Sequence, residues 1–227
     1  MKAIILCAGR GTRLKPLTDT APKTLLLVQG KPILEYILRE LPENITEVFL
    51  VVGYLGEKIR DFVESKNYPF SINYIQQIPD KKGTGAALLS VKPFINKGER
   101  FLVLNGDDLI KKHDLENLLL HSRSFQVQHA ILPGHYKIIS KEGFLSRFEP
   151  QTDEEKEKGA LVATGAYVLD SNFFDFEPRE VWGGEIGIPQ TLVAHTHDYP
   201  VTTVVCTSWK PINTIEHLER ANKDFSY

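Results

Sequence analysis

The feature that most constrains the fold is a regular alternation of strand-like and helix-like segments in the first half of the chain. Short, continuous apolar runs, which are typical of strands buried on both faces, occur at residues 2–8, 48–52, 71–75 and 101–104. Segments with apolar residues at helical spacing lie between them, at 31–41, 55–63 and 83–91. This alternation predicts a mainly parallel, Rossmann-like α/β sheet with helices on both faces.

The pattern changes in the second half of the chain. Strand-like segments at 128–132, 144–148 and 161–169 follow one another with few helices between them. The other expected elements are an exposed loop or short helix at 151–159, a helix at 188–193, a strand at 201–206 and a closing helix at 214–222. We therefore expect antiparallel additions to the same sheet and a single domain over 1–227, built from the halves 1–112 and 113–227.

Composition limits the classes of partner. A formal net charge of -2 gives no general attraction to nucleic acid or to acidic membranes, so any phosphate binding requires a local basic cluster. Cys7 and Cys206 are too few for a disulfide framework, which favours a reduced, cytoplasmic protein. The apolar N-terminal run is too short for a signal peptide, and no later segment is long enough to span a bilayer.

A glycine-rich segment follows the first predicted strand. Ligands of open parallel sheets bind beyond the carboxyl ends of the strands, so this segment lies where a ligand is expected. Gly9 and Gly11 allow backbone N–H groups to face a phosphate without interfering side chains. Arg13 supplies a planar, two-pronged donor and Lys23 a compact point charge for phosphate oxygens. The segment is therefore a candidate phosphate-binding loop.

Two common nucleotide-binding motifs are excluded. A P-loop requires Gly-Lys-Ser/Thr at the start of a helix, and that sequence is absent. A dinucleotide fingerprint requires a third glycine, where this chain has Leu14, and an immediate helix, which Pro16 and Pro22 delay. It also requires an acidic residue after the second strand, which here ends in Val52-Gly53-Tyr54. An oxidoreductase of that class is therefore not predicted.

The segment resembles the signature of the sugar-phosphate nucleotidyltransferase family, a strand followed by Ala-Gly-x-Gly-Thr-Arg and, after a spacer, Pro-Lys. The resemblance covers nearly the whole chain and implies a glycosyltransferase-A-like fold. It also implies transfer of a nucleoside monophosphate from a nucleoside triphosphate to a sugar 1-phosphate, with release of pyrophosphate. The implied nucleotide-binding residues are Ala8, Gly9, Gly11 and Thr12, and the implied catalytic residues are Arg13 and Lys23. We expect no C-terminal β-helix domain of the kind that many relatives carry.

A second matching segment contains Gln76, Gln77, Gly83 and Thr84. In the family, a glutamine side chain and a glycine backbone group at these places bind the edge of a pyrimidine, which implies UTP or dTTP as the favoured nucleotide. The spacer is one or two residues longer than usual, so either glutamine fits the role. Gly-Thr at the start of a helix is also an ordinary cap.

Asp107 follows a buried strand and a glycine, at the ligand-bearing end of the sheet. A carboxylate there suits magnesium (Mg2+), which takes few protein ligands and completes its octahedron with phosphate oxygens and water. The resemblance implies Asp107 and Asn213 as the metal ligands, although Asn213 also fits a helix N-cap. We interpret the neighbouring Asp108 as a turn or cap residue.

The sugar-binding residues implied by the resemblance are Glu149, Thr164, Gly165 and Glu185. In the family a lysine follows the glutamate, but here Pro150 does. Because a phosphate oxygen is already a nucleophile, the expected mechanism is in-line attack with positioning and charge neutralisation. Two alternatives stay open, namely a cytidylyltransferase for phosphocholine or another alcohol phosphate and a catalytically silent regulatory homologue. We expect a monomer or small homo-oligomer that binds neither nucleic acid nor membranes.

Overall fold

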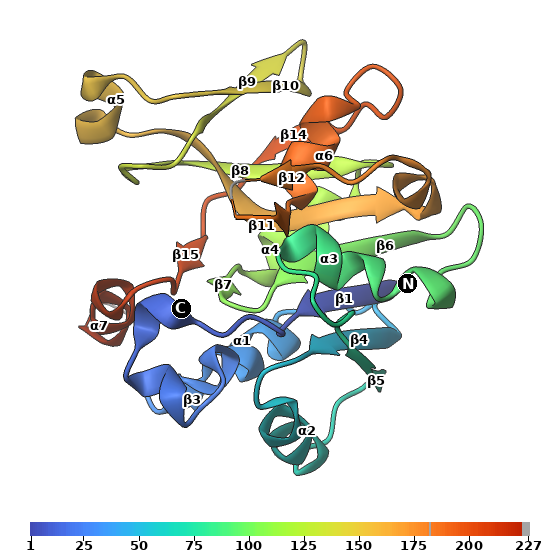
Figure 1. Cartoon of the computed structure of the whole chain (residues 1–227), viewed down its shortest axis with the longest axis vertical. Helices are drawn as coiled ribbons and strands as arrows, with labels where there is room; N and C mark the ends of the chain where they lie inside the picture. Colours follow the sequence, from blue (N-terminus) through green and yellow to red (C-terminus); the bar gives the residue numbers. More distant parts are fainter. Residues whose placement is uncertain (182, 224–227) are drawn as a thin grey trace.

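The computed structural model describes residues 1–181 and 183–223, and a nine-stranded sheet runs through it (Figure 1). From one edge to the other, its strands are β5 (Ser71–Gln76), β4 (Glu47–Val52), β1 (Lys2–Leu6), β6 (Arg100–Asn105), β11 (Ala160–Asp170), β8 (Ser124–Ala130), β14 (Thr202–Val205), β10 (Phe144–Glu149) and β9 (Lys137–Lys141). Strands β5, β4, β1 and β6 are parallel neighbours, whereas β11 pairs antiparallel with both β6 and β8. Beyond β8, one parallel pairing with β14 precedes the antiparallel β10 and β9. The expected fold class is thereby confirmed.

Helices cover both faces of the sheet, as predicted. One face packs against α1 (Ile33–Arg39), α2 (Gly56–Glu64), α4 (Lys112–Leu119) and α7 (Ile215–Lys223), and the other against α3 (Thr84–Leu89) and α6 (Ile188–Ala194). Strand β1 contributes to both cores because its side chains alternate, with Ala3 and Ile5 on the first face and Ile4 on the second. The short α5 (Asp153–Lys158) lies beside the β9–β10 hairpin and buries none of its residues (Figure 1).

Smaller elements complete the chain. Three two-stranded ladders join β2 (Leu27–Val28) to β3 (Lys31–Pro32), β7 (Asp108–Leu109) to β15 (Lys210–Pro211), and β12 (Glu180–Val181) to β13 (Glu185–Ile186). The 3₁₀ helices are η1 (Thr12–Leu14), η2 (Leu17–Asp19), η3 (Lys23–Leu25), η4 (Lys92–Phe94) and η5 (Ser171–Asp175). Within 1–181 and 183–223, no helix combines the length and the apolar character that crossing a membrane requires.

Several elements differ from the sequence-based expectations, among them β8, α4 and β9. Strand β8 begins four residues early, at Ser124, because the buried polar side chains of Ser124 and Gln126 mask its start. Helix α4 and the edge strand β9 were not predicted, since each buries few apolar side chains, Leu115 and Leu118 in α4 and Ile138 in β9. The charged run at 151–159 forms α5, the short helix that was one of its two expected structures, and Thr152 and Glu155 make a capping box. None of these differences moves a residue of the predicted site.

Candidate active site

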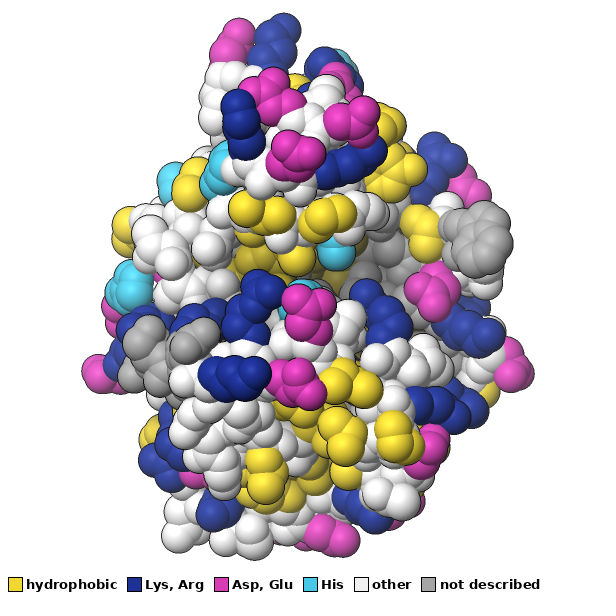
Figure 2. Space-filling view, turned by 90° about the vertical axis from the view of Figure 1, so that its left-hand side faces the viewer, with side chains coloured by type: hydrophobic (Ala, Val, Ile, Leu, Met, Phe, Trp, Pro, Cys, Tyr) yellow, Lys and Arg dark blue, Asp and Glu magenta, His cyan; other side chains and the backbone are white. Residues whose placement is uncertain are grey.

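A cleft of about 1070 Å³ opens at the carboxyl ends of β1, β5 and β6. Figure 2 shows one side of the molecule hollowed across its middle, with Lys and Arg side chains around the hollow. The predicted site residues that line the cleft are Ala8, Gly9, Gly11, Thr12, Arg13, Lys23, Gln76, Gln77, Gly83, Thr84, Asp107, Thr164, Gly165, Glu185 and Asn213. The tertiary structure therefore gathers both halves of the sequence around one cavity.

Side-chain hydroxyl groups donate hydrogen bonds to backbone carbonyl groups of the glycine loop and of the segment that follows it. Gly11 has a positive φ of 62°, and the Thr18 hydroxyl donates a hydrogen bond of 2.9 Å to its carbonyl oxygen. The Tyr54 hydroxyl, from the end of β4, donates to the carbonyl oxygen of Asp19 at 2.9 Å. Short 3₁₀ helices replace the long helix that would follow a dinucleotide fingerprint. The loop is thus a preformed rim of the cleft.

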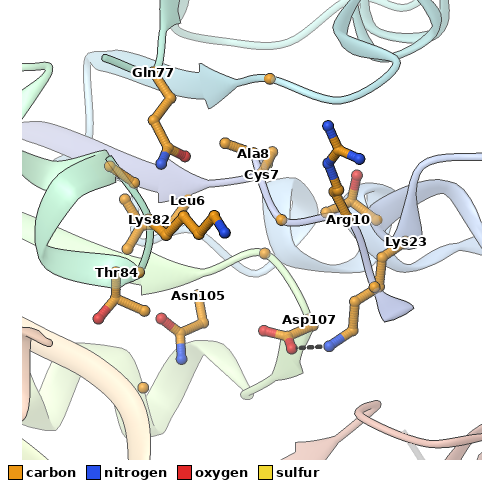
Figure 3. Close-up of a pocket in the computed structure, with 18 of the residues that line it drawn as sticks. Leu6, Cys7, Ala8, Arg10, Lys23, Gln77, Lys82, Thr84, Asn105 and Asp107 are labelled. Atoms are coloured by element: carbon orange, nitrogen blue, oxygen red, sulfur yellow. Dashed lines mark hydrogen bonds and ion pairs between the residues drawn. The ribbon is translucent and has the colours of Figure 1, made fainter. Parts of the chain in front are cut away.

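Four predicted residues meet at one end of the cleft. The Lys23 ammonium contacts the Asp107 carboxylate, as Figure 3 shows, and donates a hydrogen bond of 2.9 Å to the amide oxygen of Asn213. The Arg13 guanidinium lies 3.4 Å from the same amide oxygen. The side chains of Lys23 and Asp107 are only 11% and 20% exposed, so their charges are weakly screened.

Backbone contacts bring the two distant acceptors together. The ladder of β7 and β15 pairs Leu109 with Lys210, and the Ile212 N–H donates to the Asp107 carbonyl oxygen at 2.9 Å. Gly106 allows the strand end to pack closely, because a Cβ there would lie 2.7 Å from the Leu6 carbonyl oxygen. Asp107 and Asn213 consequently face the same point.

These two residues fit the ligand set of a magnesium ion. Their side-chain oxygens both accept hydrogen bonds from the Lys23 ammonium, so the two oxygens lie close enough to contact one cation. The described part of the chain contains no cluster of three or more His, Cys, Asp or Glu side chains able to hold a metal. A metal between Asp107 and Asn213 would therefore take most of its ligands from substrate and water, as magnesium does.

The opposite end of the cleft carries the predicted base-reading segment. Gln77 and Lys82 extend into the cavity in Figure 3, and the Gln77 side-chain amide donates to the Lys81 carbonyl oxygen at 2.7 Å. Gly83 has a positive φ of 93°, and a Cβ there would lie 2.3 Å from the Ile186 carbonyl oxygen. Only glycine allows this close approach. Gly83 therefore lets the nucleotide half pack against the segment that carries Glu185.

The predicted sugar residues do not all line the cleft. Gly165 lies in an irregularity of β11 with a φ of +85°, packed against Asn105 and Asp108. Among the described residues that line the cavity, Glu149 is absent. Its carboxylate accepts hydrogen bonds from Arg147 at 2.6 Å, which holds the pKa of Glu149 below its usual range, and Lys137 lies at 3.5 Å. Its predicted contact with a sugar stays a prediction.

Several residues that line the cleft were not predicted from the sequence. They are Arg10, Tyr54, Asn105, Asp108, His135 and Trp209, among others. Asp108 is more than a turn residue, because its buried carboxylate accepts hydrogen bonds from the Trp209 indole at 2.7 Å and from the Asn105 amide at 3.0 Å. Burial, and then the charge of Asp107, raises the pKa of Asp108. Tryptophan is uncommon in this chain, and the position of Trp209 close to Asn213 was the sequence signal that could have identified this contact.

A solved structure has the same architecture as this chain. A crystal structure described as UDP-glucose pyrophosphorylase complexed with UDP-glucose superposes with a TM-score of 0.83, covering 99% of this chain and 97% of that one at 20% identity. At this identity the likeness is one of fold. Fold and cleft together define an α/β protein of the nucleotide-sugar pyrophosphorylase architecture.

Sequence comparison identifies the family. The model of the nucleotidyl transferase family matches residues 2–225, so this chain belongs to that family, and the resemblance inferred from the glycine loop is confirmed. The bifunctional protein GlmU of Methanocaldococcus jannaschii is 35% identical over 77% of this chain, which spans 41% of that protein. N-acetylmuramate alpha-1-phosphate uridylyltransferase of Neisseria meningitidis is 40% identical over 48% of each chain. The chain thus spans less than half the length of both relatives.

Proposed function

We propose that this chain is a sugar-1-phosphate nucleotidyltransferase that transfers a nucleoside monophosphate from a nucleoside triphosphate to a sugar 1-phosphate and releases pyrophosphate. The observation that carries the proposal is the convergence of Lys23, Asp107 and Asn213 at one end of the cleft. The name of the Neisseria meningitidis relative, which states uridylyl transfer to a sugar 1-phosphate, supports the same reaction class.

The chemistry requires positioning rather than a general base. An oxygen of the sugar phosphate attacks the α-phosphorus, the bond from that phosphorus to the bridging oxygen breaks, and pyrophosphate leaves with the bonding electrons. Arg13 and Lys23 neutralise the charge that develops on the phosphate oxygens, and the N–H groups of residues 9–12 bind the triphosphate. Asp107 and Asn213 would hold magnesium, which supplies charge neutralisation at the phosphates when bound.

Base recognition is assigned to Gln77 together with Gly83, and UTP or dTTP is the proposed nucleotide. Side chains alternate along β5, where Ile72 and Tyr74 pack towards α1 and α2 whereas Ile75 packs with the α3 side. The Gln77 N–H continues the ladder to the Val52 carbonyl oxygen at 2.9 Å, so Gln77 shares the side of Ile75 and α3. Gln76 also lines the cleft, but the alternation puts its side chain on the other side of β5, so Gln76 is the weaker candidate.

Thr164, Gly165 and Glu185 are proposed to contact the sugar, since they line the same cleft as the glycine loop. Residues 1–112 would form the nucleotide-binding half and 113–227 the sugar-binding half of one domain, and both halves contribute strands to the nine-stranded sheet. Cys7 and Cys206 are both free and buried, which supports a cytoplasmic location.

The test is pyrophosphate release from a panel of four nucleoside triphosphates combined with hexose, N-acetylhexosamine and N-acetylmuramate 1-phosphates. Choline phosphate with CTP is included as a separate arm. The proposal expects magnesium-dependent release with at least one sugar 1-phosphate and a pyrimidine nucleotide. Release only with choline phosphate and CTP would identify a cytidylyltransferase instead. The absence of release with every pair, from protein that binds nucleotide, would indicate a catalytically silent homologue.

A further inference from the structure

We propose that Trp209 is a positioning residue whose buried indole N–H holds the segment carrying Asn213 against the segment carrying Asp107. This inference rests on the proposed function, because it assumes that Asp107 and Asn213 bind the metal together. Neither Trp209 nor its acceptor Asp108 belongs to the proposed ligand set. The role of the pair is to keep two ligands from distant parts of the chain at one point.

The backbone connection between the two segments is slight. Strands β7 and β15 contain two residues each, and Pro211, which pairs with Asp108, has no N–H to donate. The Ile212 N–H adds one hydrogen bond to the Asp107 carbonyl oxygen. Such a short ladder leaves the separation of the Asp107 and Asn213 side chains dependent on additional contacts.

The indole supplies such a contact. Its Nε1 donates a hydrogen bond of 2.7 Å to Oδ1 of Asp108, and the two residues are only 7% and 6% exposed. The second carboxylate oxygen of Asp108 accepts from the Asn105 amide at 3.0 Å. Both oxygens are therefore satisfied by donors from separate segments, and a buried oxygen that loses its donor leaves an unpaired polar group.

The segment before Trp209 is itself firmly anchored. The Trp209 N–H donates to the side-chain oxygen of Gln128 in β8 at 3.0 Å. The buried Asp114 of α4 accepts hydrogen bonds from the N–H groups of Thr207 at 3.1 Å and Ser208 at 2.9 Å. Trp209 thus stands between a rigid support on one side and Asp108 on the other. Its indole N–H therefore fixes the position of Asp108 at the metal-binding end of the cleft.

Loss of the indole N–H would leave one buried oxygen of Asp108 without this donor. Movement of the carboxylate toward solvent or other donors then lowers the free energy. That movement carries the adjacent Asp107 with it. Outer partners that orient metal ligands typically contribute about 10- to 100-fold to metal affinity or activity. Trp209→Phe removes the N–H while keeping most of the buried aromatic surface.

The chain offers a matched control in Tyr199, a buried aromatic residue of the opposite core. Its hydroxyl accepts a hydrogen bond of 2.9 Å from the Asp170 N–H, and Tyr199→Phe removes that bond. Both variants lose the polar contacts of a buried ring, which for Tyr199 include a weaker bond of 3.5 Å from its hydroxyl to the Asp170 carbonyl oxygen. They differ in that Tyr199 does not line the cleft.

Mn2+ binding in the presence of a non-hydrolysable UTP analogue, followed by electron paramagnetic resonance, measures the effect directly. We expect Trp209→Phe to weaken Mn2+ binding about 10- to 100-fold and to raise the magnesium needed for half-maximal activity similarly. The KM for the sugar 1-phosphate should stay within about twofold of wild type, because Trp209 acts on the metal ligands. Tyr199→Phe should bind Mn2+ like wild type.

Wild-type Mn2+ affinity in folded Trp209→Phe, or equal losses in both variants, would overturn the positioning role. An Asp107→Ala arm separates this failure from failure of the proposed function. If Asp107→Ala also binds Mn2+ normally, then the metal site itself is wrongly assigned. Should Trp209→Phe fail to fold, Asp108→Ala removes the acceptor and keeps the indole. The same loss of Mn2+ affinity is expected from it, and wild-type affinity would contradict the proposal.

Discussion

The Lys23 ammonium contacts the Asp107 carboxylate although 84 positions separate the two residues in the sequence. The same ammonium also binds Asn213, so one cation links both proposed metal ligands. A lysine so placed lies beside both proposed metal ligands, and we propose that it also contacts the phosphate oxygens of the nucleotide.

Asp107→Ala should abolish magnesium-dependent turnover while the protein stays folded. The variant removes the only carboxylate that contacts Lys23 among the described residues, and with it the anionic ligand of the proposed magnesium site. Pyrophosphate release and the far-UV circular dichroism spectrum measure the two effects. Asp153→Ala is the control, since that carboxylate is almost fully exposed on α5. Near wild-type turnover in folded Asp107→Ala would disprove the metal assignment.

Arg13→Ala and Lys23→Ala should each lower kcat by about 10²- to 10³-fold. Contacts from charged donors to phosphate strengthen as charge develops in the transition state, so their loss affects the chemical step. Lys15→Ala is a matched control, because Lys15 lies on the same loop but is exposed and paired with Asp19. Steady-state kinetics with both substrates decide the outcome. A rise in KM with unchanged kcat would mean that these residues bind only the ground state.

UTP or dTTP should exceed GTP and ATP in kcat/KM by about tenfold or more, which corresponds to ~1.4 kcal/mol. A site built to hydrogen-bond a pyrimidine rejects a purine because its polar groups are left unpaired. Gln77→Ala should reduce this preference, whereas Gln76→Ala, the adjacent change on the other side of β5, should preserve it. A clear preference for GTP in the wild-type enzyme would contradict the base assignment.

Gly165→Ala should cost both stability and activity. The residue has a φ of +85°, and a Cβ would lie 2.1 Å from the Asn105 amide nitrogen and 2.4 Å from an oxygen of Asp108. Gly143→Ala is the matched control, because Gly143 has a similar φ of +83° but no atom within 4 Å of its Cβ position. Backbone strain alone should lower the free energy of unfolding by about 1–2 kcal/mol in both. Chemical denaturation should show a larger loss for Gly165→Ala, and equal losses would contradict the close packing.

The sequence by itself determined the α/β class, the parallel first half of the sheet and the location of the glycine loop. These features depend on local periodicity and on glycines and prolines at fixed positions, which a linear pattern reveals. Residues 9–13 and 105–107 were predicted to lie near one another because carboxyl ends of parallel strands share one edge of a sheet. The edge strand β9 and helix α4 escaped prediction because each buries only one or two apolar side chains, which is too few to produce a clear periodic pattern.

Only the tertiary structure decided how Asp107 meets Asn213, which of the two glutamines faces α3, and why Trp209 lies where it does. Each answer depends on contacts between segments far apart in the chain, such as the β7–β15 ladder and the bond from Trp209 to Asp108. A linear pattern records what a residue is but not which distant segment packs against it. The hydrogen-bond partners of the buried Asp108 could therefore be identified only from the tertiary structure.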